Sequence, residues 1–181
     1  MKYKNLLISR YILISKYTGI ILIFAGAAIL SPLIFLIAYP EEINLASHFI
    51  LAGGLSVLTG TILYIYGYNH QEKDVELSLN EGGIIVVFSW LLTIIFSAVP
   101  FVTILNMNWS HSIFEVVSGW TTTGLSLVDV TTAPKLILIW RSIMQFFGGA
   151  GLAVIALSSL LPVHGMGLYM AEARSDKLLP H

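Results

Sequence analysis

The chain alternates between long apolar stretches and short polar turns. Apolar runs with little or no charge cover residues 18–38, 48–68, 83–105 and 136–161. Because about twenty apolar residues let a helix cross a bilayer, each run predicts a membrane-spanning helix. The pattern therefore indicates an all-α integral membrane protein with four transmembrane helices.

The first predicted span contains a proline and a group of small residues. Pro32 has no N–H and is expected to kink the helix, with Ser31 or a neighbouring helix satisfying the freed carbonyl. Gly26, Ala27 and Ala28 would let a second helix approach closely. A lipid-facing helix that tolerates small residues is the alternative interpretation.

The segment between the third and fourth spans is too short and too polar to cross the membrane. Residues 112–119 show a half-length helical pattern, and a polar run containing glycine follows at 120–126. Non-helical backbone survives at membrane depth only where protein buries it or where it lines a wet cavity. We therefore predict a re-entrant pore helix over 112–119 and a filter loop over 120–126.

Composition supports a membrane protein and excludes several functions. Of the 181 residues, 56% are hydrophobic and 10% are charged, whereas about 25% are charged in soluble domains. A net charge of −1 offers no basic surface for nucleic acid, and the absence of cysteine excludes thiolate chemistry. The chain has no GxSxG or HExxH motif and no paired intramembrane acids, so we predict neither an enzyme nor a bound cofactor.

The basic residues predict the orientation in the membrane, because cytoplasmic loops carry an excess of Lys and Arg near the span ends. The N-terminus, the 69–81 loop and the C-terminus would lie on one side. That side would hold Lys2, Lys4, Arg10, Lys16, Lys73, Arg174 and Lys177, and the other side Lys135, with Arg141 inside the fourth span. We expect both termini in the cytoplasm and the 120–126 loop at the outer face.

The chemistry of the loop favours a cation. The short helix would direct its partially negative C-terminal end toward the loop. An extended run over 121–124 would present backbone carbonyls in place of an ion's hydration shell. Gly124 permits backbone angles that aim a carbonyl inward without a Cβ clash, and the threonine hydroxyls would add oxygens or tie the loop to its scaffold.

Residues 114–124 resemble the first pore loop of the Trk/Ktr/HKT superfamily of potassium transporters. Other stretches resemble the helices and the linker around that loop, namely 80–83 with 89–90, 140–142, 145–146, 148–151, 171–173 and 176–178. The extra N-terminal hairpin is similar to that of the TrkH/TrkG-like branch, in which two helices precede four pore repeats.

The resemblance implies a domain organisation and a site. The chain would comprise a transmembrane hairpin at 1–80, a first pore repeat at 81–170 and a cytoplasmic linker at 171–181 toward a next repeat. The filter would consist of Thr121, Thr122, Thr123, Gly124 and Leu125, with potassium held at Thr122, Thr123 and Gly124; the residues supporting it would be Glu115, Ser118, Gly119 and Arg141.

The resemblance also implies partners and a location. We expect potassium uptake across a bacterial or archaeal cytoplasmic membrane, with the remaining pore repeats alongside and a homodimer as one form of assembly. A cytosolic, nucleotide-binding regulatory subunit (TrkA-like) would dock on the 69–81 loop and the 171–181 tail. Gly124 favours potassium, since a serine at this position accompanies sodium in some plant relatives.

Several alternatives stay open. One loop supplies a quarter of a filter, so the chain would be part of a longer protein, the product of a truncated reading frame, or a single repeat that assembles as a homotetramer. A non-conducting membrane scaffold is a further alternative. Glu115 would attract cations at the mouth or bond backbone N–H groups near the pore-helix N-terminus. Arg141 would pair with Glu115 or Asp129, or extend to the interface. The glycines at 148, 149 and 151 would form a hinge or pack closely against the pore helix.

Overall fold

The computed structural model describes residues 2–70 and 79–160, which form helices joined by short turns and one longer loop. The predicted linker at 171–181 lies outside these described residues. The elements are α1 (Lys2–Leu30), η1 (Ser31–Ile37), η2 (Pro40–Leu45), α2 (Ala46–His70), α3 (Leu79–Ile104), α4 (Trp109–Trp120) and α5 (Lys135–Leu160), where η marks a 3₁₀ helix.

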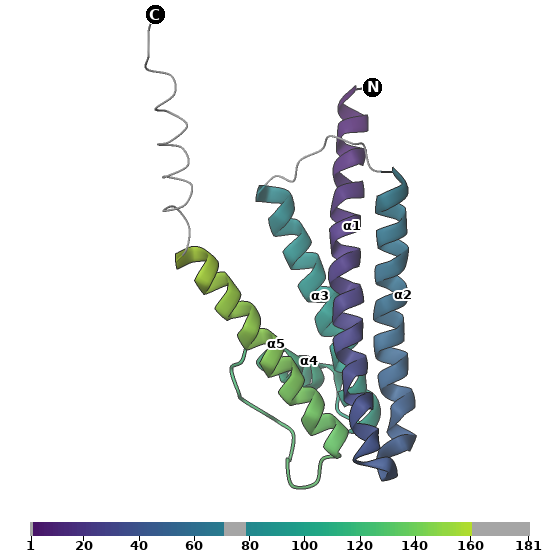
Figure 1. The fold of residues 1–181 in the computed structure, drawn as a ribbon, viewed down its shortest axis with the longest axis vertical. Coiled ribbons are helices and arrows are strands. Elements are labelled where there is room, and N and C mark those ends of the chain that lie inside the picture. The colour runs from purple at the N-terminus through teal and green to yellow at the C-terminus, as the bar shows by residue number, and fades with distance from the viewer. Residues whose placement is uncertain (1, 71–78, 161–181) are drawn as a thin grey trace, which may run out of the picture.

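The long helices form an antiparallel bundle. Helices α1, α2 and α3 contact one another, α5 crosses beside them at an angle, and the short α4 contacts both α3 and α5 (Figure 1). The start of α1, the end of α2 and the start of α3 lie at one end of the molecule, and α5 runs from the opposite end toward it (Figure 1). This arrangement confirms the predicted all-helical membrane fold.

Three stretches of the described residues are long and apolar enough to cross a membrane. They are Arg10–Ile37, Pro40–Asn69 and Asn80–Ile104, and they correspond to the first three predicted spans. The fourth predicted span forms α5, which is not among the three and carries Lys135 and Arg141 in its first two turns. Its 26 residues would still rise about 39 Å, which exceeds the roughly 30 Å of a bilayer core.

Pro32 ends α1 at the place where the sequence predicts a kink. The chain passes there into the 3₁₀ helix η1. The Ser31 hydroxyl donates to the Ala28 carbonyl at 2.7 Å, which is the oxygen that loses its i+4 partner because proline has no N–H. The first of the two predicted ways of satisfying that carbonyl is therefore the one used.

Helices α1 and α2 pack closely through glycines spaced seven residues apart on each helix. A Cβ on Gly19 would lie 2.6 Å from the Gly60 carbonyl oxygen, and one on Gly26 would lie 2.8 Å from that of Gly53. The buried Ser56 hydroxyl adds a bond across the interface to the Leu22 carbonyl at 2.9 Å. Small residues allow such close backbone approach, and interhelical hydrogen bonds add to it where water is absent.

One apolar core joins this hairpin to the other helices. Its fully buried members include Ile29 and Phe49 of the hairpin, Phe101 of α3, Val116 of α4 and Trp140 of α5. The hairpin is thus packed into the same core as the segment around α4, so it serves as part of the scaffold for that segment.

We predict that Gly60→Ala destabilises the hairpin by about 1–3 kcal/mol, the usual cost of overpacking. The added methyl would lie 2.7 Å from the Gly19 carbonyl oxygen and 2.8 Å from the Ile23 nitrogen. Gly54→Ala is the matched control on the same helix, because nothing lies within 4 Å of its added Cβ. Thermal unfolding in detergent measures both variants, and equal midpoints would contradict this account of the interface.

Candidate functional site

Helix α4 is the half-length helix that the sequence predicts, and it is longer than expected. It spans Trp109–Trp120, twelve residues, instead of 112–119. Asn108 provides the N-cap, because its side chain accepts the His111 backbone N–H at 2.9 Å. Its last turn leads directly into the Thr/Gly run.

The predicted extended conformation over 121–124 is wrong for its first half. Thr123 N–H donates to the Ser118 carbonyl at 3.0 Å, and Thr122 N–H donates to the Gly119 carbonyl at 3.1 Å. These two bonds form a Schellman closure of α4, with Thr122 in the left-handed position at φ +55°. The physical reason is that the end of a helix must satisfy its free carbonyls, and the run supplies the N–H groups.

Thr122 occupies a conformation that is costly for a β-branched residue. Left-handed backbone costs L-residues about 1–2 kcal/mol, and glycine is the usual residue at this position of a helix end. Strained residues of this kind persist only where the surrounding structure holds them, and they cluster at functional sites. Gly124 follows at φ +82°, where glycine is the residue without strain.

A buried carboxylate holds the segment that follows the run. Glu115, on the inner face of α4, is 1% exposed. It accepts the Leu127 backbone N–H at 2.8 Å and the Ser126 hydroxyl at 2.9 Å. Of the two interpretations of Glu115, bonding to a backbone N–H is the one seen, although that N–H belongs to the chain returning from the loop.

Arg141 of α5 completes this arrangement. Its Nε lies 2.6 Å from Glu115 Oε1, so of the two acidic partners considered for Arg141 the structure uses Glu115. Asp129 instead accepts the backbone N–H and the hydroxyl of Thr131 at 2.9 and 2.6 Å. Those bonds, the side-chain one first, lower the pKa of Asp129 on the exposed turn.

We call the set Glu115, Arg141, Ser126 and the Leu127 N–H the carboxylate clamp. It joins three separate segments, since α4, the returning loop and α5 each contribute. A charge buried at this depth requires a partner and further hydrogen bonds, and the clamp provides both. Its geometry therefore fixes where the loop returns relative to the two helices.

The other two predicted support residues, Ser118 and Gly119, lie in the last turns of α4. The Ser118 hydroxyl donates to the Leu125 carbonyl at 2.5 Å, which turns that carbonyl toward α4. A Cβ on Gly119 would lie 3.0 Å from the Met144 side chain, and one on Gly148 would overlap the Trp120 carbonyl oxygen. Of the two interpretations of the α5 glycines, Gly148 thus shows close packing against α4.

Two tryptophans that the sequence did not single out for this role anchor α4 and α5 to α3. Trp120 Nε1 donates to the Ser97 hydroxyl at 3.2 Å, and Trp140 Nε1 donates to the Ser97 carbonyl at 3.3 Å. The two rings meet edge to face with centroids 6.2 Å apart. A tryptophan within an apolar stretch indicates that its indole N–H needs a hydrogen-bond partner once it is buried. The sequence does not show which segment provides that partner.

Residues 121–127 are exposed, whereas Glu115 and Ser118, which bond the loop from α4, are buried. A half-length helix and a returning loop between two long helices define the class of membrane proteins built from helix–pore loop–helix repeats. The family model for TrkH, described as a cation transport protein, matches residues 50–179. The chain belongs to this family.

Individual relatives support the same family assignment. The Trk system potassium uptake protein TrkH of Salmonella typhimurium is 37% identical over 165 residues, which cover 88% of this chain and 33% of the relative. TrkG of Escherichia coli K12 is 37% identical over 123 residues, covering 62% and 25%. The crystal structure of the potassium transporter TrkH from Vibrio parahaemolyticus matches with a TM-score of 0.69 and 25% identity, over 92% of this chain and 36% of that one. The chain thus spans about a third of the length of these relatives, or less.

We predict that Glu115 and Arg141 are energetically coupled. Glu115→Gln or Arg141→Met alone should cost about 3–5 kcal/mol, because each leaves a buried charge unpaired. The double variant should cost less than the sum, with a coupling of about 0.5–3 kcal/mol in unfolding free energy. Asp129→Asn combined with Arg141→Met is the matched control and should be additive, since Asp129 bonds Thr131. Additivity of the Glu115 pair would contradict the clamp.

Proposed function

We propose that this chain contributes one quarter of a potassium-selective filter to a Trk-type uptake system in the cytoplasmic membrane. The observation that carries the proposal is the carboxylate clamp, because it secures against two helices a non-helical loop that we expect to lie at membrane depth. Such backbone is tolerated there when it lines a wet pathway. The names of the relatives, which are potassium uptake proteins, favour potassium as the transported ion.

The carbonyls of Thr122, Thr123 and Gly124 are the proposed ion ligands. The N–H groups of Thr122 and Thr123 donate to carbonyls at the end of α4, and no hydrogen bond within the described part of the chain ends on the carbonyls of Thr122, Thr123 or Gly124. We assign Leu125 to the support of the loop, because its carbonyl accepts the Ser118 hydroxyl. Rings of backbone carbonyls replace the hydration shell of a cation, and the C-terminal end of α4 adds a partial negative charge.

The exposed side of the loop is the proposed contact with three further pore loops. Residues 121–127 are exposed, and this surface is where a fourfold filter would close. The loops would come from other repeats of a longer transporter; a homotetramer of this repeat is the second arrangement. A non-conducting scaffold is a weaker candidate, because it does not require a strained Thr122 beside a clamped loop.

The remaining assignments follow from the predicted topology. The ends of α1 and α3 that meet through the Arg10–Glu81 ion pair at 2.8 Å would face the cytoplasm, and Asp129 would lie on the outer side. A cytosolic nucleotide-binding subunit (TrkA-like) would dock on the cytoplasmic side. Residues 71–78 and 161–181, which would form much of that surface, lie outside the described part of the chain.

We predict that Gly124→Asp abolishes potassium-dependent growth while the protein still reaches the membrane. At φ +82° glycine is the residue without strain, and the new carboxylate would place a fixed negative charge beside the proposed ion ligands, so potassium uptake should fall about tenfold or more. The change is made at the native chromosomal position, so that the chain is produced with everything it normally assembles with. Uptake of ⁸⁶Rb⁺ and immunoblotting of membranes are the measurements.

Gly83→Asp serves as the control, because Gly83 is exposed at the start of α3 and nothing lies within 4 Å of its added Cβ. It introduces the same side chain away from the loop and should retain uptake. Normal uptake in the Gly124 variant at normal abundance would reject the filter.

A further inference from the structure

Glu42 lies in the predicted hairpin, far from the loop in sequence, yet it contacts the start of α5. Its Oε1 accepts the Lys135 backbone N–H at 2.7 Å and its Oε2 accepts the Leu136 N–H at 2.9 Å. The residues joined are 93 and 94 positions apart. Both carboxylate oxygens are thus used to cap a helix from a different part of the chain.

The start of α5 depends on this carboxylate. The first N–H groups of a helix have no partner within the helix, and Pro134, directly before α5, has no N–H to contribute. The first intrahelical bond runs from the Leu138 N–H to the Pro134 carbonyl at 3.2 Å. Glu42 satisfies the N–H groups of Lys135 and Leu136 at the start of the helix, and its negative charge faces the positive end of the helix dipole.

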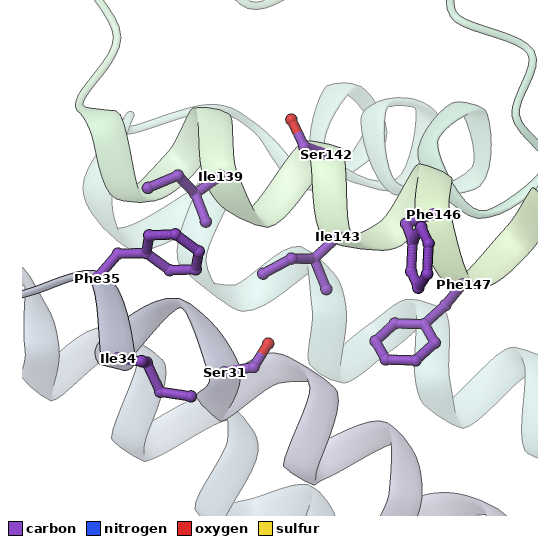
Figure 2. A pocket seen from close by; sticks show the side chains of 8 residues that line it. All are labelled: Ser31, Ile34, Phe35, Ile139, Ser142, Ile143, Phe146 and Phe147. Atoms are coloured by element: carbon purple, nitrogen blue, oxygen red, sulfur yellow. The ribbon is translucent and has the colours of Figure 1, made fainter.

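The rest of the seam between the hairpin and α5 is partly open. A cavity of about 560 Å³ separates η1 from α5 and is lined mostly by apolar side chains. Figure 2 shows Phe35 and Ile34 of η1 on one side, with Ile139 and Ile143 of α5 across from them. Leu136 and Ile137 of α5 are fully buried in the shared core, but apolar contact is non-directional, so the two Glu42 bonds supply the directional part of this attachment.

The position of α5 matters because α5 carries Arg141. Arg141 lies six residues after Lys135, which is about 9 Å along the helix. It binds Glu115, and Glu115 holds the Leu127 N–H of the returning loop. A shift of the first turn of α5 is therefore transmitted through one rigid helix to the carboxylate clamp.

From these contacts we infer that Glu42 is a positioning residue for the filter: it ties the hairpin to α5 and thereby sets the geometry of the carboxylate clamp and the selectivity of the loop. The inference rests on the proposed function. It also assigns a role to the hairpin, which is to buttress the first pore loop from outside the repeat.

The test is ion selectivity in variants made at the native chromosomal position. Glu42→Ala removes both acceptors, which leaves the Lys135 and Leu136 N–H groups uncapped, and should lower the ratio of K⁺ to Na⁺ uptake about tenfold as the carboxylate clamp moves. Glu42→Gln keeps one acceptor and should give an intermediate ratio. Glu41→Gln is the matched control, because Glu41 is the exposed neighbour in the same turn, and it should keep the wild-type ratio.

The uptake ratio and the activity of the wild-type protein distinguish a failure of this inference from a failure of the proposed function. The ratio compares uptake of two ions by the same variant, so a loss of protein abundance alone does not change it. If Glu42→Ala does not accumulate, Glu42→Gln decides the question. A wild-type ratio in the Glu42 variants that accumulate, with active wild-type protein, overturns this inference alone. Absence of potassium uptake by the wild-type protein overturns the proposed function instead.

Discussion

The constraint on which this structure depends is the cost of leaving buried backbone groups without a hydrogen bond. The loop after α4 pays little of that cost, because Thr122 and Thr123 give their N–H groups to the end of α4 and Leu127 gives its own to Glu115. Glu115 in turn needs a cation, which Arg141 supplies. A buried ion pair of this kind adds little net stability compared with an apolar pair, so we interpret it as a device that specifies position.

The hairpin belongs to the same system of constraints. Its two helices approach closely through glycines, and its buried faces share one core with α3, α4 and α5. Its turn reaches α5 through Glu42. The loop is therefore held from two directions, by α3 through the tryptophan bonds to Ser97 and by the hairpin through α5.

Much of the fold could be predicted because apolar length and proline act locally. Four apolar runs give the long helices, and Pro32 marks where α1 ends.

The candidate functional site was less predictable than the fold. Threonine rarely takes a left-handed conformation, so the run 121–124 did not predict that Thr122 would form the left-handed end of α4. Glu115, Arg141 and Gly148 could be singled out as an intramembrane acid, an intramembrane base and a packing glycine, but local patterns did not show that Glu115 would bond Leu127. The role of Glu42 at the start of α5 could not be predicted from local sequence, because its partners lie more than ninety residues away.

The central claim is that the carbonyls of Thr122, Thr123 and Gly124 contact the transported ion while the carboxylate clamp holds the loop. The most direct measurement is a structure of this chain in its complete assembly, crystallised with Rb⁺ and analysed by anomalous scattering. We expect an anomalous peak within coordination distance of those carbonyls, with Arg141 and Glu115 still paired. Well-ordered loops with no ion beside them, or with these carbonyls turned away from the axis, would contradict it.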